Sequence, residues 1–369
     1  MSRGLYIHIP FCRQKCRYCD FASFAGMENL TDAYLSALDK EASFFSGQKF
    51  DTLYVGGGTP SLLSPAALER LLGMISRRFG PVSSFAESTL EANPESLTPE
   101  KLRLLKAAGI NRLSLGLQSF DDMTLRRIGR VHDVKTFLSA YEAARTAGVE
   151  NINVDLIAGL PGQTEEAFLA GLRRLADLKP EHISVYGLQV EEGTPFYREG
   201  VKTDDDLLRR ELEQTHFMLE QAGFVHYEIS NFARPGRESR HNVNYWLDGE
   251  YLGLGSAAAS YLDGERRSNV SDVREYLRRM EQSKHAVASS ERLSGKAKEG
   301  ERIMLGLRML GGVRLGTLTW EMFGREIREI VSRGLVEQNG DLLKLTFEGL
   351  FLANQAFMAF VGPFEEETC

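Results

Sequence analysis

Apolar residues follow two different periods along the first 220 positions of the chain. Six short runs rich in Val, Ile, Leu and Tyr lack strict alternation, which is typical of strands buried on both faces of a parallel sheet. These runs are residues 5–9, 52–57, 88–93, 112–118, 152–159 and 182–189. Helical patterns lie between them and begin at the capping residue types Thr31, Ser64, Thr98 and Thr164. Alternating strands and helices predict an α/β fold, either a parallel barrel or a doubly wound sheet.

Glycine-rich and polar segments follow these strands and favour the barrel. They include "PFCRQKC", "GGGTP", "NPES", "QSF" and "GLPGQT". In a parallel barrel such loops meet at the carboxyl ends of the strands, where sites are built. Six units are two fewer than a full barrel has, so we expect a partial (βα)6 barrel with a wide mouth.

The pattern of predicted elements changes twice in the remainder of the chain. A helix is expected over 204–222, followed by an edge strand and turn in "HYEISNFARPG". From about residue 291 the sequence has two amphipathic helices and a hairpin signal at Asn339-Gly340, as in a small winged-helix-like domain. We therefore expect a barrel over 1–225, a connecting extension over 226–290 and a C-terminal domain over 291–369.

Charge and hydropathy exclude several classes of protein. The formal net charge is −7, which argues against a protein that coats nucleic acid, and residues 317–369 are themselves acidic. No apolar run approaches the roughly 18 residues of a membrane span. The N-terminal apolar stretch is short and is expected to be a strand, not a signal peptide. Because the few cysteines form no disulfide framework, a reducing cytoplasm is expected.

Three of the four cysteines, Cys12, Cys16 and Cys19, lie within eight residues, and Cys369 ends the chain. Structural zinc usually takes four ligands, so three thiolates would need a further ligand such as His8. A disulfide with a spare thiol would be unusual in a reducing compartment. A [4Fe–4S] cluster held by three thiolates would keep one iron open for another ligand.

The spacing Cys-x3-Cys-x2-Cys, with Tyr18 before the last cysteine and "GGGTP" after the next strand, resembles the radical S-adenosylmethionine (SAM) superfamily. The resemblance implies a [4Fe–4S] cluster on Cys12, Cys16 and Cys19 whose open iron is chelated by SAM. Electron transfer from the cluster would then cleave SAM to a 5′-deoxyadenosyl radical.

Motifs along nearly the whole chain resemble the HemN-like (coproporphyrinogen III dehydrogenase-like) family, among them "YIHIPFC", "LEANPES", "NRLSLGLQSF" and "NVDLIAGLPGQT". This resemblance implies a partial six-unit barrel with a small helical C-terminal domain. Tyr6, Gly57 and Glu91 match positions that contact the SAM on the cluster. Further matches to SAM contacts, some of them to a second SAM, are Tyr18, Gly58, Thr59, Gln118, Arg130, Asp155 and Gln189.

Two departures and one motif point to the heme chaperone branch of this family, the HemW type. Phe21 stands where the dehydrogenase has a fourth cysteine, and the first barrel strand begins near residue 5 without the dehydrogenase's longer N-terminal segment. "HNVNYW", residues 241–246, matches the HNxxYW signature of the branch. That branch binds heme and is thought to deliver it to acceptors such as respiratory enzymes.

The chemistry of heme suggests roles for residues of this motif. His241 could be an axial ligand, and Tyr245 and Trp246 could offer flat apolar faces. Arg237 and Arg240 could pair with the propionates. The alternative is that His241 caps a loop and Trp246 anchors the barrel rim.

The leading expectation is a heme chaperone with a cluster and a SAM site, which needs heme-acceptor proteins and an electron donor. The alternative is a radical SAM oxidoreductase that acts on a porphyrin. No catalytic residue is assigned, and neither nucleic acid nor a membrane segment is expected.

Overall fold

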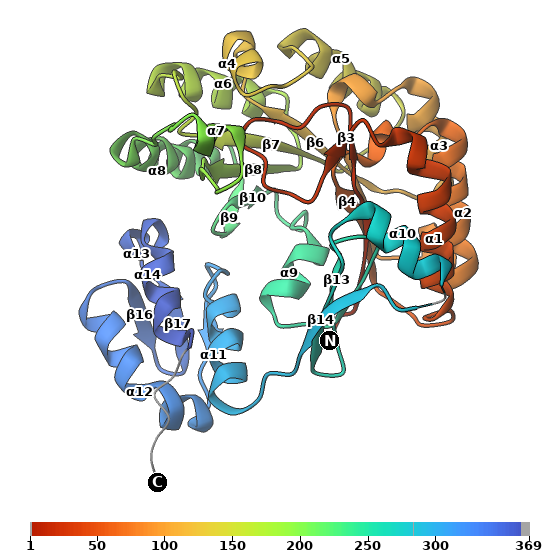
Figure 1. Ribbon diagram of the computed structural model, residues 1–369. Coiled ribbons are helices and arrows are strands. Elements are labelled where there is room, and N and C mark those ends of the chain that lie inside the picture. The colour runs from red at the N-terminus through yellow and green to blue at the C-terminus, as the bar shows by residue number, and fades with distance from the viewer. Residues whose placement is uncertain (1, 283, 363–369) are drawn as a thin grey trace.

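The computed structural model describes residues 2–282 and 284–362, and six parallel strands form its centre (Figure 1). Their order in the sheet follows their order in the chain. They are β1 (Gly4–Ile9), β4 (Thr52–Gly57), β5 (Glu87–Ala92), β6 (Arg112–Gln118), β7 (Ile152–Ala158) and β8 (His182–Gly187). Each lies within one or two residues of its predicted run, and the predicted partial barrel is confirmed.

The helices that connect these strands pack on the outer face of the sheet. They are α1 (Thr31–Ser43), α2 (Pro65–Phe79), α3 (Pro99–Ala108), α4 (Asp122–Arg127), α5 (Val134–Thr146), α6 (Glu165–Asp177), α7 (Pro195–Arg198) and α8 (Asp205–Gln221). Ser64, Thr98 and Thr164 cap α2, α3 and α6 as predicted. The prediction for Thr31 is wrong, because Thr31 is already helical and its hydroxyl donates to the Glu28 carbonyl at 2.7 Å.

The sheet extends beyond the six strands at both ends and does not close. Next to β1 lies β11 (Tyr251–Leu254), which is parallel to it, followed by β12 (Ala259–Leu262), β13 (Glu265–Asn269) and β14 (Val287–Glu291). Next to β8 lie β10 (Asn231–Ala233) and β9 (Val225–Glu228). Helix α10 (Val273–Glu281) packs against α1. Residues 226–290 therefore complete the barrel sheet itself, and β9 and β14 are its two edges.

The HNxxYW segment forms a short helix, α9 (Arg240–Trp246), that the sequence analysis did not predict as a helix. The carboxylate of Glu87, at the start of β5, accepts from the backbone N–H groups of Arg240 and His241, each at 3.0 Å. A carboxylate at a helix N-terminus satisfies free N–H groups and opposes the helix dipole. In Figure 1, α9 lies between the sheet and the C-terminal helices.

The C-terminal residues form a second core with its own small sheet. Its elements are α11 (Gly295–Gly306), β15 (Val313–Arg314), α12 (Thr317–Ser332), β16 (Val336–Asn339), β17 (Leu342–Leu345), α13 (Phe347–Phe351) and α14 (Ala353–Phe357). Ile303, Phe323 and Ile327 are fully buried in this core. Gly340 takes a positive φ of 63° in the predicted hairpin between β16 and β17. The helices α11 and α12 followed by this hairpin confirm the predicted winged-helix-like fold.

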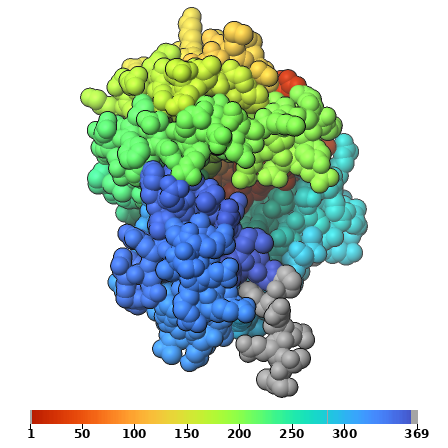
Figure 2. Space-filling view, turned by 90° about the vertical axis from the view of Figure 1, so that its left-hand side faces the viewer, coloured from red at the N-terminus to blue at the C-terminus, as the bar shows by residue number. Residues whose placement is uncertain are grey.

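The C-terminal residues pack beneath the part of the barrel that includes α8 (Figure 2). Arg209 on α8 donates to both carboxylate oxygens of Glu348 on α13, at 2.8 and 2.7 Å. Among the described residues, no helix is both long and apolar enough to cross a membrane.

Candidate functional site

The cysteine loop lies at the carboxyl end of the barrel and is fixed by backbone hydrogen bonds. Cys12 ends β2 (Phe11–Cys12), which pairs with β3 (Phe24–Ala25) and closes the loop at its base. The Arg17 N–H donates to the Ile128 carbonyl at 3.0 Å, and the Arg17 carbonyl accepts from the Phe196 N–H at 3.0 Å. The loop is therefore held between the segments that follow β6 and β8.

The three thiols of this loop are free and differ in their surroundings. Cys12 is buried, with its Sγ 3.4 Å from the hydroxyl of Thr59. A guanidinium nitrogen of Arg130 donates to the Sγ of Cys16 at 3.6 Å. Burial raises the pKa of the Cys12 and Cys19 thiols. Thiols of raised pKa bind as thiolates only when a cationic metal centre replaces the proton.

Three thiols with no fourth cysteine in the loop suit an iron–sulfur cluster better than structural zinc, which usually takes four ligands. Zn–S bonds of about 2.3 Å would bring the sulfurs of a zinc site to within about 4 Å of each other. A cluster spreads its ligands further apart because each thiolate binds a different iron. Cys12, Cys16 and Cys19 are thus suited to a [4Fe–4S] cluster.

Asn93 links the cysteine environment together and was missed as a site residue. Its amide nitrogen donates to the Thr59 hydroxyl at 3.1 Å, and its amide oxygen accepts from Arg130 at 2.7 Å. Arg130 also donates to the Gly116 carbonyl at 2.6 Å. One side chain therefore positions both groups that contact cysteine sulfurs. Its position directly after β5, in the quoted "LEANPES", was the available signal.

Glu91 and the glycines after β4 form the second part of the site. The Glu91 carboxylate accepts from the Tyr54 hydroxyl at 2.7 Å and from the Gly57 N–H at 3.0 Å. Burial raises the pKa of Glu91 to about 7. Gly57 has a φ of 115°, and a Cβ on Gly58 would lie 2.7 Å from the Phe11 carbonyl oxygen. The backbone thus approaches the cysteine strand as only glycine permits.

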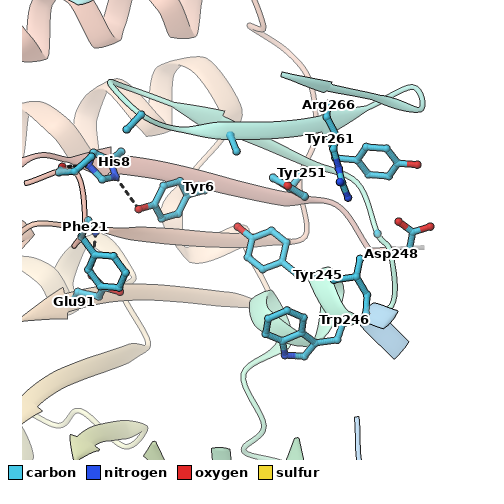
Figure 3. A pocket seen from close by; sticks show the side chains of 16 residues that line it. Tyr6, His8, Phe21, Glu91, Tyr245, Trp246, Asp248, Tyr251, Tyr261 and Arg266 are labelled. Atoms are coloured by element: carbon cyan, nitrogen blue, oxygen red, sulfur yellow. Dashed lines mark hydrogen bonds between the residues drawn. The ribbon is translucent and has the colours of Figure 1, made fainter. Parts of the chain in front are cut away.

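One cavity of about 520 Å³ joins these residues to the HNxxYW helix (Figure 3). Most of its lining is aromatic or apolar. The lining residues are Tyr6, His8, Phe21, Ala22, Gly57, Glu91, Tyr245, Trp246, Asp248, Gly249, Tyr251, Ala257, Ala259, Tyr261, Arg266 and Leu305. Three residues matched to SAM contacts, Tyr6, Gly57 and Glu91, therefore share a cavity with Tyr245 and Trp246.

The remaining residues matched to SAM contacts lie outside this cavity lining. Gln118 ends β6 with a positive φ of 71° beside a register shift. Asp155 accepts from the Asn153 amide at 2.8 Å inside the barrel, where burial raises its pKa. Tyr18 packs in a small apolar cluster with residues such as Phe196. Gln189 is exposed beyond β8.

Arg112 is a buried cation that the sequence analysis also missed. Its side chain is 2% exposed at the start of β6, and its Nε is buried without a hydrogen-bond partner among the described residues. Burial is the main cause of the lowered pKa of His182 and His241, and the charge of Arg112 lowers both pKa values further. No local pattern distinguishes this arginine from the surface arginines of the chain.

His241 points into the barrel and has a partner at each ring nitrogen. Its Nδ1 lies 2.8 Å from the Thr52 hydroxyl and its Nε2 lies 2.7 Å from the Tyr245 hydroxyl. The ring stacks on Tyr54 at 5.2 Å, and burial lowers the pKa of His241 to about 3. The neutral ring thus presents no free nitrogen to a heme iron. This geometry does not support the expectation of an axial ligand at His241.

Arg237 and Arg240, expected to pair with propionates, are exposed and do not line the cavity. Trp246 and Tyr245 do line it, as expected of flat faces for a porphyrin. Helix α9 therefore contributes Tyr245 and Trp246, at its C-terminal end, to the cavity lining. His241 lies behind these two side chains and does not line the cavity.

Comparisons with known proteins agree with this architecture. The family model of the radical SAM superfamily matches residues 6–175, and the HemN C-terminal domain matches residues 293–352. The solved structure of coproporphyrinogen III oxidase (HemN) from Escherichia coli, a radical SAM enzyme, is similar with a TM-score of 0.87 at 25% identity. That match covers 97% of this chain and 90% of HemN.

Relatives of closely similar length are named heme chaperone HemW. The one from Bacillus subtilis is 38% identical, over 98% of this chain and 99% of the relative. The one from Escherichia coli is 33% identical, over 97% of this chain and 98% of the relative. The cysteine loop, the Glu91 site and the HNxxYW helix agree with these similarities. Together with them, the identity over nearly the full length shows that the chain belongs to the heme chaperone HemW family of radical SAM proteins.

Proposed function

We propose that this protein binds heme in the barrel cavity and transfers it to acceptor proteins, with a [4Fe–4S] cluster and SAM at the cavity's inner end. The observation that carries the proposal is the single cavity shared by Glu91 and the aromatic residues of α9. Its aromatic and apolar lining suits a flat macrocycle. The names of the relatives support the same function.

The cluster would be held by Cys12, Cys16 and Cys19, with Thr59 and Arg130 beside their sulfurs. When bound, such a cluster would supply an open iron for SAM and an electron for its reductive cleavage. Tyr6, Gly57 and Glu91, which line the cavity, would orient SAM, and Glu91 would accept from its hydroxyl or amino groups. The electron donor and the heme acceptor would be separate proteins.

We propose that His241 acts through Tyr245 and is not itself bound to the iron. The hydrogen bond between His241 Nε2 and the Tyr245 hydroxyl fixes a ring that lines the cavity. His241 is thus a positioning residue of the heme site.

The second candidate is a radical SAM oxidoreductase that acts on a porphyrin. The structural similarity to HemN favours it. Arg130 and Gln118, which the family resemblance matches to SAM contacts, favour it as well. Phe21 weighs against it, because this residue lines the cavity with 66% of its surface exposed where the enzyme has a fourth cysteine.

One experiment separates the two functions. The protein is reconstituted anaerobically and titrated with heme, with and without SAM, and is then incubated with coproporphyrinogen III, SAM and a reductant. The chaperone predicts a stable stoichiometric heme complex and an unchanged coproporphyrinogen. Turnover of coproporphyrinogen without stable heme binding would establish the enzyme instead.

A further inference from the structure

We propose that Arg266 receives a carboxylate of the porphyrin at the outer end of the cavity and exchanges its present partner, Glu301, for that ligand. This inference rests on the proposed heme binding. It assigns the carboxylate-binding end of the site and the orientation of the ligand within it.

Arg266 lies on β13 and is the cationic residue among the described side chains that line the cavity. In Figure 3, Arg266 and Tyr261 lie at the opposite end of the pocket from His8, Phe21 and Glu91. Its guanidinium lies 5.8 Å from the ring centre of Tyr261. An arginine held at an aromatic ring in this way presents a planar fork that matches a carboxylate.

The charges of the lining determine which way a porphyrin with two propionates enters. Glu91 is at the inner end, where a carboxylate would meet another carboxyl group and no lining cation. Arg266 is at the outer end, where the carboxylate of Asp248 is already paired with Lys298 at 2.6 Å. The propionates therefore point outward to Arg266, and the opposite edge of the macrocycle faces Tyr6 and Glu91. This orientation keeps the propionates away from the SAM residues, as a chaperone requires and a propionate-oxidising enzyme does not.

The surroundings of Arg266 allow the exchange without leaving a buried charge alone. Arg266 forms an ion pair with Glu301 of α11, which is 7% exposed. Lys298, on the same helix, lies 3.3 Å from Glu301 and 2.6 Å from Asp248. When a propionate takes Arg266, Glu301 keeps Lys298 as its partner. Since an unpaired buried carboxylate is costly, this second cation makes the exchange feasible.

The test compares heme with heme dimethyl ester, which has the same macrocycle without free carboxylates. We expect the wild-type protein to bind heme about 10- to 100-fold more tightly than the ester, as for a hydrogen bond to a charged group. Arg266→Gln should lose most of that difference, with heme affinity falling and ester affinity unchanged.

The matched control is Arg267→Gln. Arg267 is the next residue on β13, and its guanidinium pairs with Glu265 at 2.6 Å outside the cavity. This variant should keep the wild-type preference for heme, and Arg266→Lys should keep part of it. Iron and sulfide content checks that each variant is folded.

Three outcomes would overturn the inference while heme binding stands. The first is that the wild-type protein binds heme and its ester equally tightly. The second is that Arg266→Gln keeps the full preference for heme over the ester. The third is that Arg267→Gln loses as much of this preference as Arg266→Gln does. If a variant does not fold, equal wild-type affinities for the two ligands would still overturn the inference. If the wild-type protein binds neither ligand, the proposed function fails as well.

Discussion

At the scale of single residues, two of the cysteines, Cys12 and Cys16, have different surroundings. Cys12 is buried against Thr59, while Cys16 is partly exposed and faces the guanidinium of Arg130. A fixed cation beside a cluster ligand favours added negative charge on the cluster. The environment of Cys16 is therefore suited to stabilise the reduced state, and that of Cys12 to exclude water.

Replacing Cys16 with Ala should abolish the cluster, because two thiolates cannot hold the cubane in place. We expect iron and sulfide after anaerobic reconstitution to fall to background, together with the broad absorption near 400 nm. Cys369→Ala is the control, since that cysteine lies outside the described residues and outside the motif. Normal iron and sulfide in Cys16→Ala would refute the ligand assignment.

Replacing His241 with Gln tests whether this residue positions Tyr245. We expect heme affinity to fall about 2- to 10-fold, as for one lost neutral hydrogen bond, with the Soret maximum unmoved. Tyr245→Phe breaks the same hydrogen bond and should give a similar loss. Tyr251→Phe, which removes a hydroxyl from the same cavity, should leave the affinity intact. A shifted Soret band in His241→Gln alone would make the histidine an iron ligand.

At the scale of elements, α8 shows how an outer helix is tied to the barrel through a buried acid. Glu211 of α8 is fully buried, and its carboxylate accepts from the Gly159 N–H at 2.6 Å just after β7. Its other oxygen is buried without a partner among the described residues, and burial raises the pKa of Glu211 to about 7. Ionising this group in the folded protein therefore costs stability.

This pKa predicts a pH dependence of stability. Since the pKa of Glu211 is higher folded than unfolded, its contribution is fully present below about pH 4.5 and is lost as the pH rises through 7. Between pH 5.5 and 8 we expect wild-type protein to lose about 2 kcal/mol from this group, and Glu211→Gln to lose none of it. Urea unfolding at several pH values measures the slopes. Glu213→Gln on the same helix is the control and should keep the wild-type slope.

The elements that the sequence predicted are those specified by neighbouring residues. The six barrel strands and the caps at Ser64, Thr98 and Thr164 are local patterns and were found. Helix α9 was not, because its N-terminal N–H groups are satisfied by Glu87, some 150 residues earlier in the chain. The strands β11 to β14 were missed for a similar reason, since they are stable only as additions to the edge of β1.

The same distinction holds for the site. Short motifs are enough to single out Cys12, Cys16, Cys19 and the glycines after β4 as candidates. Asn93, Arg112 and Arg266 act across strands, and nothing in their immediate sequence separates them from other polar residues. The expected propionate partners, Arg237 and Arg240, were chosen for closeness to the motif in sequence, but the chain turns them away from the cavity.

At the scale of the whole molecule, the C-terminal core forms part of the wall of the cavity. Leu305 of α11 lines the cavity, and Lys298 and Glu301 of the same helix surround its outer end. The contact between Arg209 and Glu348 holds the two parts together at a second place. Heme retention should therefore depend on the C-terminal residues, whereas cluster binding should not.

A chain that ends at Arg292 tests this dependence. We expect normal iron and sulfide content, because every cluster ligand is retained, and heme dissociation at least about tenfold faster, which corresponds to about 1.4 kcal/mol of lost contacts. The iron content is the internal control for folding. An unchanged dissociation rate in this chain would show that the C-terminal core does not help to retain heme.

The sheet that ends at β9 and β14 has a mechanical consequence for a stiff, disc-shaped cargo. A closed barrel would have to part its strands, at the cost of many backbone hydrogen bonds, before such a disc could leave. Here the edge strands β9 and β14 are not hydrogen-bonded to each other, so edgewise release of the proposed heme would break no such bonds, and α11, which contributes Leu305 to the cavity wall, would have to move aside. An acceptor protein that competes for α11 would then set the timing of delivery.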